Sequence, residues 1–141
     1  MKMMNWFTFA IISLVLWGFW GFFYKIATNY IDAKSIFIWS TISGLIITII
    51  VIAPFFFTGF RPEVHAKGIT FAMLGGIMGT LGALLFLFSM KLGKASVVVT
   101  ITALYPIITI ILAFFILKET ITLKQGIGIL FALTAVGLLA K

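Results

Sequence analysis

Few side chains in this sequence are able to do acid–base or metal chemistry. The 141 residues include three acids, one histidine and no cysteine. Asp32, Glu63 and Glu119 are expected in loops, with His65 beside one of them. These residues leave almost nothing from which to build a catalytic constellation, and the absence of cysteine excludes disulfides and thiolate metal sites. We expect no catalytic residue, no metal site and no cofactor, and hence a protein that is not an enzyme.

One stripe of polar and aromatic residues lies near the N-terminus. Ser13, Trp17, Trp20 and Tyr24 recur at helical spacing, and Lys25 closes the same face. Trp17 is deep in its segment, where its N–H needs a partner from another helix or from a ligand. Both a packed core and a solute cavity explain this stripe. We expect Lys25 at the membrane interface if the helix ends there, and inside the protein if the helix continues.

A second polar group surrounds a proline in the segment 95–117. Pro106 removes a backbone donor and frees the carbonyl of Thr102, while Tyr105 lies close by. Broken helices with polar groups at mid-membrane depth form solute sites in transporters. A structural kink satisfied by neighbouring threonines is the alternative. Thr80, in the segment 68–90, is a further candidate that faces either a neighbouring helix or a cavity.

Two sets of small residues at helical spacing predict close helix contacts, because small side chains let helix backbones approach. The residues are Gly75, Gly79 and Gly82 in one segment and Gly128, Ala132 and Ala135 in another. The second set is the expected contact between two copies of the chain.

The composition identifies the elements that must position these residues. Hydrophobic residues make up 63% of the chain and charged residues 9%, too few for the surface of a soluble domain. The net charge is +7, but the basic residues are scattered rather than clustered, so no nucleic-acid partner is expected.

Five stretches without Asp, Glu, Lys or Arg divide the chain, and a membrane-spanning helix needs about 20 apolar residues. We predict an all-α polytopic membrane protein, a single domain over residues 1–141, with transmembrane spans at about 4–25, 35–57, 68–90, 95–117 and 122–140. A barrel would show alternating polarity, which the apolar run 46–52 lacks. The first stretch is too long for a signal peptide and is expected to remain as a span. Thr122 and Gln125 match a capping box, which predicts a helix start near Leu123.

The basic residues divide evenly between the two membrane faces. Counting spans along the chain, the N-terminal side has Lys2, Arg61, Lys67, Lys118 and Lys124. The other side has Lys25, Lys34, Lys91, Lys94 and Lys141. Orientation normally follows an excess of Lys and Arg on the cytoplasmic side. The tie predicts dual topology, with copies inserted both ways and paired as an antiparallel homodimer; the alternative is a chance tie.

Several short motifs resemble the EamA domains of the drug/metabolite transporter superfamily, over essentially the whole chain. They are Leu16-Trp17-Gly18 followed by Lys25, Leu104-Tyr105-Pro106-Ile107, the turn from Leu117 to Thr122, Gln125-Gly126 and Gly137. Most members have two five-helix halves in inverted orientation, so the resemblance implies a dimer that rebuilds ten helices. It also implies a central cavity, favouring Trp17, Tyr24, Lys25 and Tyr105 as lining residues. The small multidrug-resistance exporters are similar antiparallel dimers, but their glutamate in helix one is absent here, so their proton-coupled cation export is not expected.

Together these features predict a transporter of small metabolites or drug-like solutes in the cell membrane, working by alternating access. The expected partners are the solute, the lipid bilayer and a second, inverted copy. A cavity that exposes Lys25 suits anionic solutes, and an aromatic cavity without it suits amphipathic ones. The alternatives are a subunit that needs a paralogous partner and a non-transporting assembly protein.

Overall fold

The computed structural model describes residues 6–139, which form helices and loops and contain no strand. The helices are α1 (Trp6–Ala27), α2 (Ala33–Phe57), α3 (Ala66–Leu92), α4 (Ala95–Thr102), α5 (Tyr105–Leu112), the π-helical turn η1 (Ala113–Leu117) and α6 (Leu123–Leu139). They form two compact units, one ending at Leu92 and the other beginning at Gly93.

Four segments are long and apolar enough to cross a membrane. They are Phe7–Ala27, Ala33–Phe57, Ala66–Leu92 and Ala95–Leu117. The fifth expected span corresponds to a shorter apolar helix, Leu123–Leu138, and the end of its expected range lies outside the described residues. Only 6% to 11% of the most apolar window of each of the four segments is buried, so their side chains are available to lipid or to another chain.

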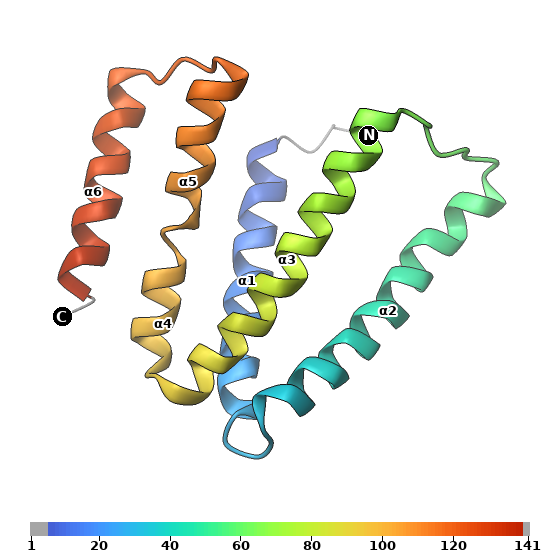
Figure 1. Cartoon of the computed structure of the whole chain (residues 1–141), viewed down its shortest axis with the longest axis horizontal. Coiled ribbons are helices and arrows are strands. Elements are labelled where there is room, and N and C mark those ends of the chain that lie inside the picture. Colours follow the sequence, from blue (N-terminus) through green and yellow to red (C-terminus); the bar gives the residue numbers. More distant parts are fainter. Residues whose placement is uncertain (1–5, 140–141) are drawn as a thin grey trace. The chain divides into compact units, whose positions relative to one another are not determined.

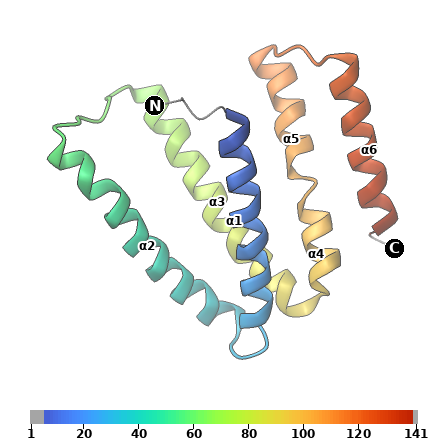
Figure 2. The ribbon, with the colours of Figure 1, turned by 180° about the vertical axis from the view of Figure 1, so that it is seen from behind.

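The first unit contains α1, α2 and α3, which run down, up and down in the view of Figure 1. Its most buried side chains gather where α1 and α3 end and α2 begins. Ala33 and Ile36 of α2 pack there against Leu87 of α3, which is fully buried. Away from this end α2 diverges from α3, as the opposite view in Figure 2 also shows. The unit is therefore held together mainly at one end.

The turn before α2 ends with an N-cap at Asp32. The Ser35 backbone N–H donates to Asp32 Oδ1 at 3.3 Å, which satisfies one of the otherwise unpaired N–H groups of the first turn. Hydrogen bonding by the Ser35 side chain, together with backbone N–H groups, lowers the pKa of the Asp32 carboxyl below its ordinary value of 3.8. At the other end of α2, Gly59 adopts a φ of +74°, which ends the helix in a turn that a glycine accommodates without strain.

In the second unit, residues 103 and 104 separate α4 from α5, and Pro106 lies in the first turn of α5. Pro106 has no N–H for the Thr102 carbonyl, and the Ile107 N–H bonds instead to the Leu104 carbonyl, 3.0 Å away. The expected kink is therefore a full interruption between two helices of eight residues each.

The connection from η1 to α6 is closed by local hydrogen bonds. Lys118 is left-handed, with a φ of 57°, and the Glu119 N–H donates to the Ala113 carbonyl at 3.2 Å. The capping box is confirmed: the Thr122 N–H donates to Gln125 Oε1 at 2.8 Å, and the Gln125 N–H donates to Thr122 Oγ1 at 3.3 Å. These two bonds fix the start of α6 at Leu123.

Candidate functional site

One residue of the predicted α1 stripe, Trp20, contacts α3. The Trp20 ring lies 4.5 Å from the Tyr24 ring and stacks on Phe86 of α3 at 5.0 Å, with 18° between the planes. Trp17 is 63% exposed, and Ser13 is half-buried. Trp20 is thus part of the contact between α1 and α3, with Tyr24 beside it. The Trp17 side chain, by contrast, is exposed on the surface of the unit.

Lys25 bonds to the end of another helix. α1 continues two residues past Lys25, and the half-buried Lys25 Nζ donates to the Met90 carbonyl of α3 at 2.8 Å. A lysine beside the last carbonyls of a helix satisfies an unpaired acceptor and complements the partial negative charge of the helix end. Lys25 therefore links the carboxyl ends of two parallel helices.

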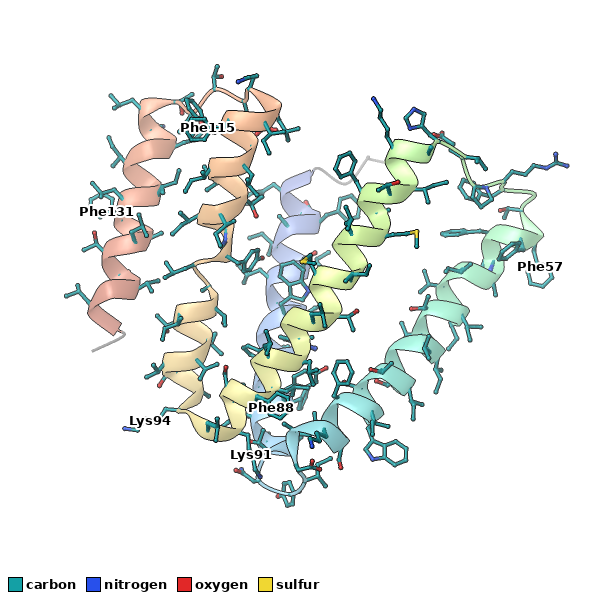
Figure 3. All side chains as sticks on the ribbon, in the orientation of Figure 1. Phe57, Phe88, Lys91, Lys94, Phe115 and Phe131 are labelled. Carbon is teal, nitrogen blue, oxygen red and sulfur yellow. The ribbon has the colours of Figure 1, made fainter. Side chains whose placement is uncertain are left out.

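Lys91 makes the converse contact, and the sequence analysis did not single it out. Lys91 Nζ donates to the Thr28 carbonyl, just beyond α1, at 2.6 Å. It also lies 3.5 Å from the Ile31 carbonyl. Figure 3 shows Lys91 at the end of α3, beside the turn that follows α1. The sequence does indicate that Lys25 and Lys91 lie in the last turns of two helices that end on the same side of the membrane, which would have pointed to contacts with helix ends.

The final carbonyls of α1 are all occupied, which explains why the helix can end at this packed position. The Thr28 hydroxyl donates to the Lys25 carbonyl at 2.7 Å. The Ile26 carbonyl accepts from the Asn29 N–H at 3.0 Å, and the Ala27 carbonyl accepts from Tyr30 and Ile31. Thr28 itself is 4% exposed.

The predicted polar residues of the other helices bond within their own helices. The Thr80 hydroxyl donates to the Gly76 carbonyl at 2.9 Å. The Thr102 hydroxyl donates to the carbonyls of Val98 and Val99 at 2.9 and 3.1 Å. Such back-bonding is the usual solution for a hydroxyl in an apolar helix. Tyr105 is 56% exposed, and Pro106 is exposed beside it.

The predicted cavity residues are divided between the two units. Thr102, Tyr105 and Pro106 belong to the second unit, whereas the α1 stripe and Thr80 belong to the first. Their meeting around a solute stays a prediction. An apolar hollow of about 260 Å³ lies elsewhere, at the end of α2, and is lined by Ile52, Phe55, Phe56, Phe60 and Pro62. None of the predicted cavity residues lines it.

The small residues predicted to pack make no close contact within the described part of the chain. A Cβ added at Gly75, Gly79, Gly82 or Gly128 would meet nothing within 4 Å among the described residues. Ala132 and Ala135 of α6 are exposed. Close approach at these positions therefore requires a partner outside the compact unit, and that role also stays a prediction.

The described residues contain no group of three or more His, Cys, Asp or Glu side chains placed to hold a metal ion. The recognisable features of this chain are instead its apolar helices and its glycine- and proline-marked breaks.

Comparison with known proteins assigns the family. The EamA-like transporter family matches residues 4–141. The chain belongs to the EamA-like transporter family. It is 30% identical over 133 residues to an uncharacterized protein of Methanocaldococcus jannaschii, and the match covers 93% of each chain. No solved structure matches the chain.

Membership of the EamA-like transporter family confirms the resemblance read from the sequence. The family and the four long apolar segments together make this an integral, multi-pass membrane protein. A family of transporters is also consistent with the expectation that the chain is not an enzyme.

Proposed function

We propose that this EamA-like protein transports small metabolites or drug-like solutes by alternating access, as an antiparallel homodimer of dual topology. The observation that carries the proposal is the even division of ten basic residues between the two sides. Insertion machinery has no charge excess on which to act, so both orientations are populated.

The described helix ends agree with this division in each unit. In the first unit, Lys25, Lys34 and Lys91 lie at one end of the helices, and Arg61 and Lys67 lie at the other. In the second unit, Lys94 precedes α4, and Lys118 and Lys124 flank the connection to α6. Each basic residue in the described part of the chain is near a helix end, where its charge bears on orientation.

The length of the relative also supports a dimer. The match covers 93% of the archaeal relative and 93% of this chain, so the two chains have similar lengths. The relative is therefore also about the size of one EamA-like domain. Two inverted copies would supply the symmetry that transporters use to exchange inward- and outward-facing states. The solute would then lie between copies, near Trp17, Tyr105 and the other predicted cavity residues.

The test uses two charge-biased variants with matched charge loss. Lys34→Ala with Lys94→Ala leaves an excess on the N-terminal side, and Lys67→Ala with Lys124→Ala leaves an equal excess on the other side. All four lysines are exposed. Each variant should adopt a single orientation and lose flux of a solute panel in vesicles, and co-expression of the two should restore it.

Full flux from either variant alone would contradict the antiparallel homodimer. Flux that appears only when a paralogue is co-expressed would indicate a hetero-oligomeric subunit. Absence of flux for every solute, even from the parent chain, would indicate an assembly role.

A further inference from the structure

The contacts that hold the first unit together are concentrated at one end. Leu87 and Met90 of α3 are fully buried there, and Thr28 and Ala33 are nearly so. By contrast, Phe71 and Met78, nearer the start of α3, are 72% and 62% exposed. The helices of the first unit are therefore packed closely at one end, and α3 is exposed toward the other.

Two reciprocal lysine contacts fasten this closed end. Lys25 Nζ reaches the Met90 carbonyl at 2.8 Å, and Lys91 Nζ reaches the Thr28 carbonyl at 2.6 Å. We call this pair of hydrogen bonds the lysine clasp. Both bonds join α1, or the turn after it, to the end of α3, and they lie at the same end of the unit as the buried cluster of Ala33, Ile36 and Leu87.

Both acceptors of the lysine clasp are main-chain carbonyls. Each lysine donates to a neutral carbonyl, so breaking the bond leaves no buried carboxylate without a partner. Lys91 is exposed and Lys25 is half-buried, and long lysine side chains at a helix end extend readily to the polar interface. The freed carbonyls lie at helix ends, where water or headgroups can bond to them.

The same geometry argues against a site for an anionic solute at these two lysines. The carboxyl end of a helix is equivalent to about half a negative charge, which repels an anion. Both ammonium groups lie against such ends. Their charges are complemented by the helices themselves, and a mechanical role fits better than a binding role.

We propose that the lysine clasp is a reversible gate at one end of the solute path: making both bonds closes that end, and breaking them opens it. The inference rests on the proposed transport function. In an antiparallel dimer, one lysine clasp lies at each membrane face. Alternating access then requires one clasp to open while the other is closed.

Distances between spin labels test the gate without requiring transport. Tyr30 and Leu92 are 82% and 89% exposed at the clasped end, and the chain has no cysteine, so Tyr30→Cys with Leu92→Cys gives a specific label pair. Labelled chains are diluted with unlabelled parent chains in vesicles, which removes distances between copies. A short-distance and a long-distance population are expected.

Clasp variants should shift these populations. Lys25→Met and Lys91→Met should each raise the ratio of long to short distances about tenfold, since a hydrogen bond to a charged group stabilises by at least about that factor. Lys25→Arg should retain the parent ratio. Lys34→Met is the matched control, because Lys34 is exposed at the same end and its loss changes the charge balance equally.

Flux measured on the same variants separates the two proposals. A changed distance ratio in Lys25→Met and Lys91→Met, together with a larger loss of flux than in Lys34→Met, supports the gate. Unchanged distances, or changed distances with parental flux, overturn it while leaving transport intact. No flux from the parent chain overturns the proposed function and the gate with it, and a distance shift would then show only that the lysines fasten α1 to α3.

Discussion

Lys25 and Lys91 each donate a hydrogen bond to a main-chain carbonyl at or just beyond the end of the other's helix. The relationship is reciprocal because α1 and α3 run in parallel and end side by side. It places two positive charges against two negative helix ends, which is favourable in a region of low dielectric. The two hydrogen bonds lie at the packed end of the first unit, together with the cluster of Ala33, Ile36 and Leu87.

Removal of Trp20 should destabilise the first unit more than removal of an exposed tryptophan. Trp20 stacks on Phe86 at 5.0 Å and contacts Tyr24. We expect Trp20→Ala to lower the free energy of unfolding by about 1–2 kcal/mol, less than for a fully buried tryptophan, and Trp20→Phe to retain most of it. Trp39→Ala is the control, because Trp39 is 65% exposed. Thermal unfolding in detergent measures the stability of both variants. Equal destabilisation by Trp20→Ala and Trp39→Ala would contradict a stabilising role of the Trp20–Phe86 stack.

The capping box should be worth a measurable amount of stability. Thr122→Ala removes the hydroxyl that accepts from the Gln125 N–H, and we expect a loss of about 1 kcal/mol. Thr120→Ala, in the same connection but outside the capping box, should change little. Faster amide exchange in the first turn of α6 for Thr122→Ala alone is the specific signature; identical exchange in both variants would argue against the cap.

Restoring a donor at Pro106 should join α4 and α5. Pro106→Ala supplies an N–H for the Thr102 carbonyl, so residues 103–106 should show slower amide exchange as one continuous helix. If the break serves transport, flux should fall severalfold although the protein is more stable. Pro54→Ala, in the unbroken helix α2, is the control. Parental flux in Pro106→Ala would make the break purely structural.

Asp32 should make stability depend on pH in one window only. Its pKa is lowered on folding, so its contribution is present above its ordinary value of 3.8 and is lost as the pH falls through the lower folded value. Asp32→Asn keeps a capping side chain and removes the titration. Between roughly pH 5 and pH 2, unfolding temperatures of parent and variant should converge as the pH falls. Parallel curves would show that Asp32 does not titrate in this range.

The sequence predicted the local elements better than their contacts. Uncharged runs located the long helices because crossing a membrane demands apolar length, and the pair Thr122 and Gln125 located the start of α6 because the capping chemistry is local. Pro106 indicated a kink, and the structure has a complete break there because the following N–H bonds three residues back.

The sites were less predictable because they depend on neighbours far along the chain. Lys25 left two placements open, and the contact that decides its surroundings comes from Met90, 65 residues away. Phe86 could not be paired with Trp20 from spacing, since stacking depends on how α1 and α3 cross. Roles for Thr102, Tyr105 and the glycines require a surface from outside their own unit, which one chain's pattern does not specify.

The labelling of single cysteines on opposite sides of the membrane tests dual topology most directly. Tyr30→Cys and Val64→Cys lie in the loops before and after α2, are 82% and 88% exposed, and leave every charge unchanged. With a membrane-impermeant maleimide added to intact cells, we predict that each variant is labelled to about half its total, the share expected of an unbiased insertion. Complete labelling of one variant and none of the other would contradict the antiparallel homodimer.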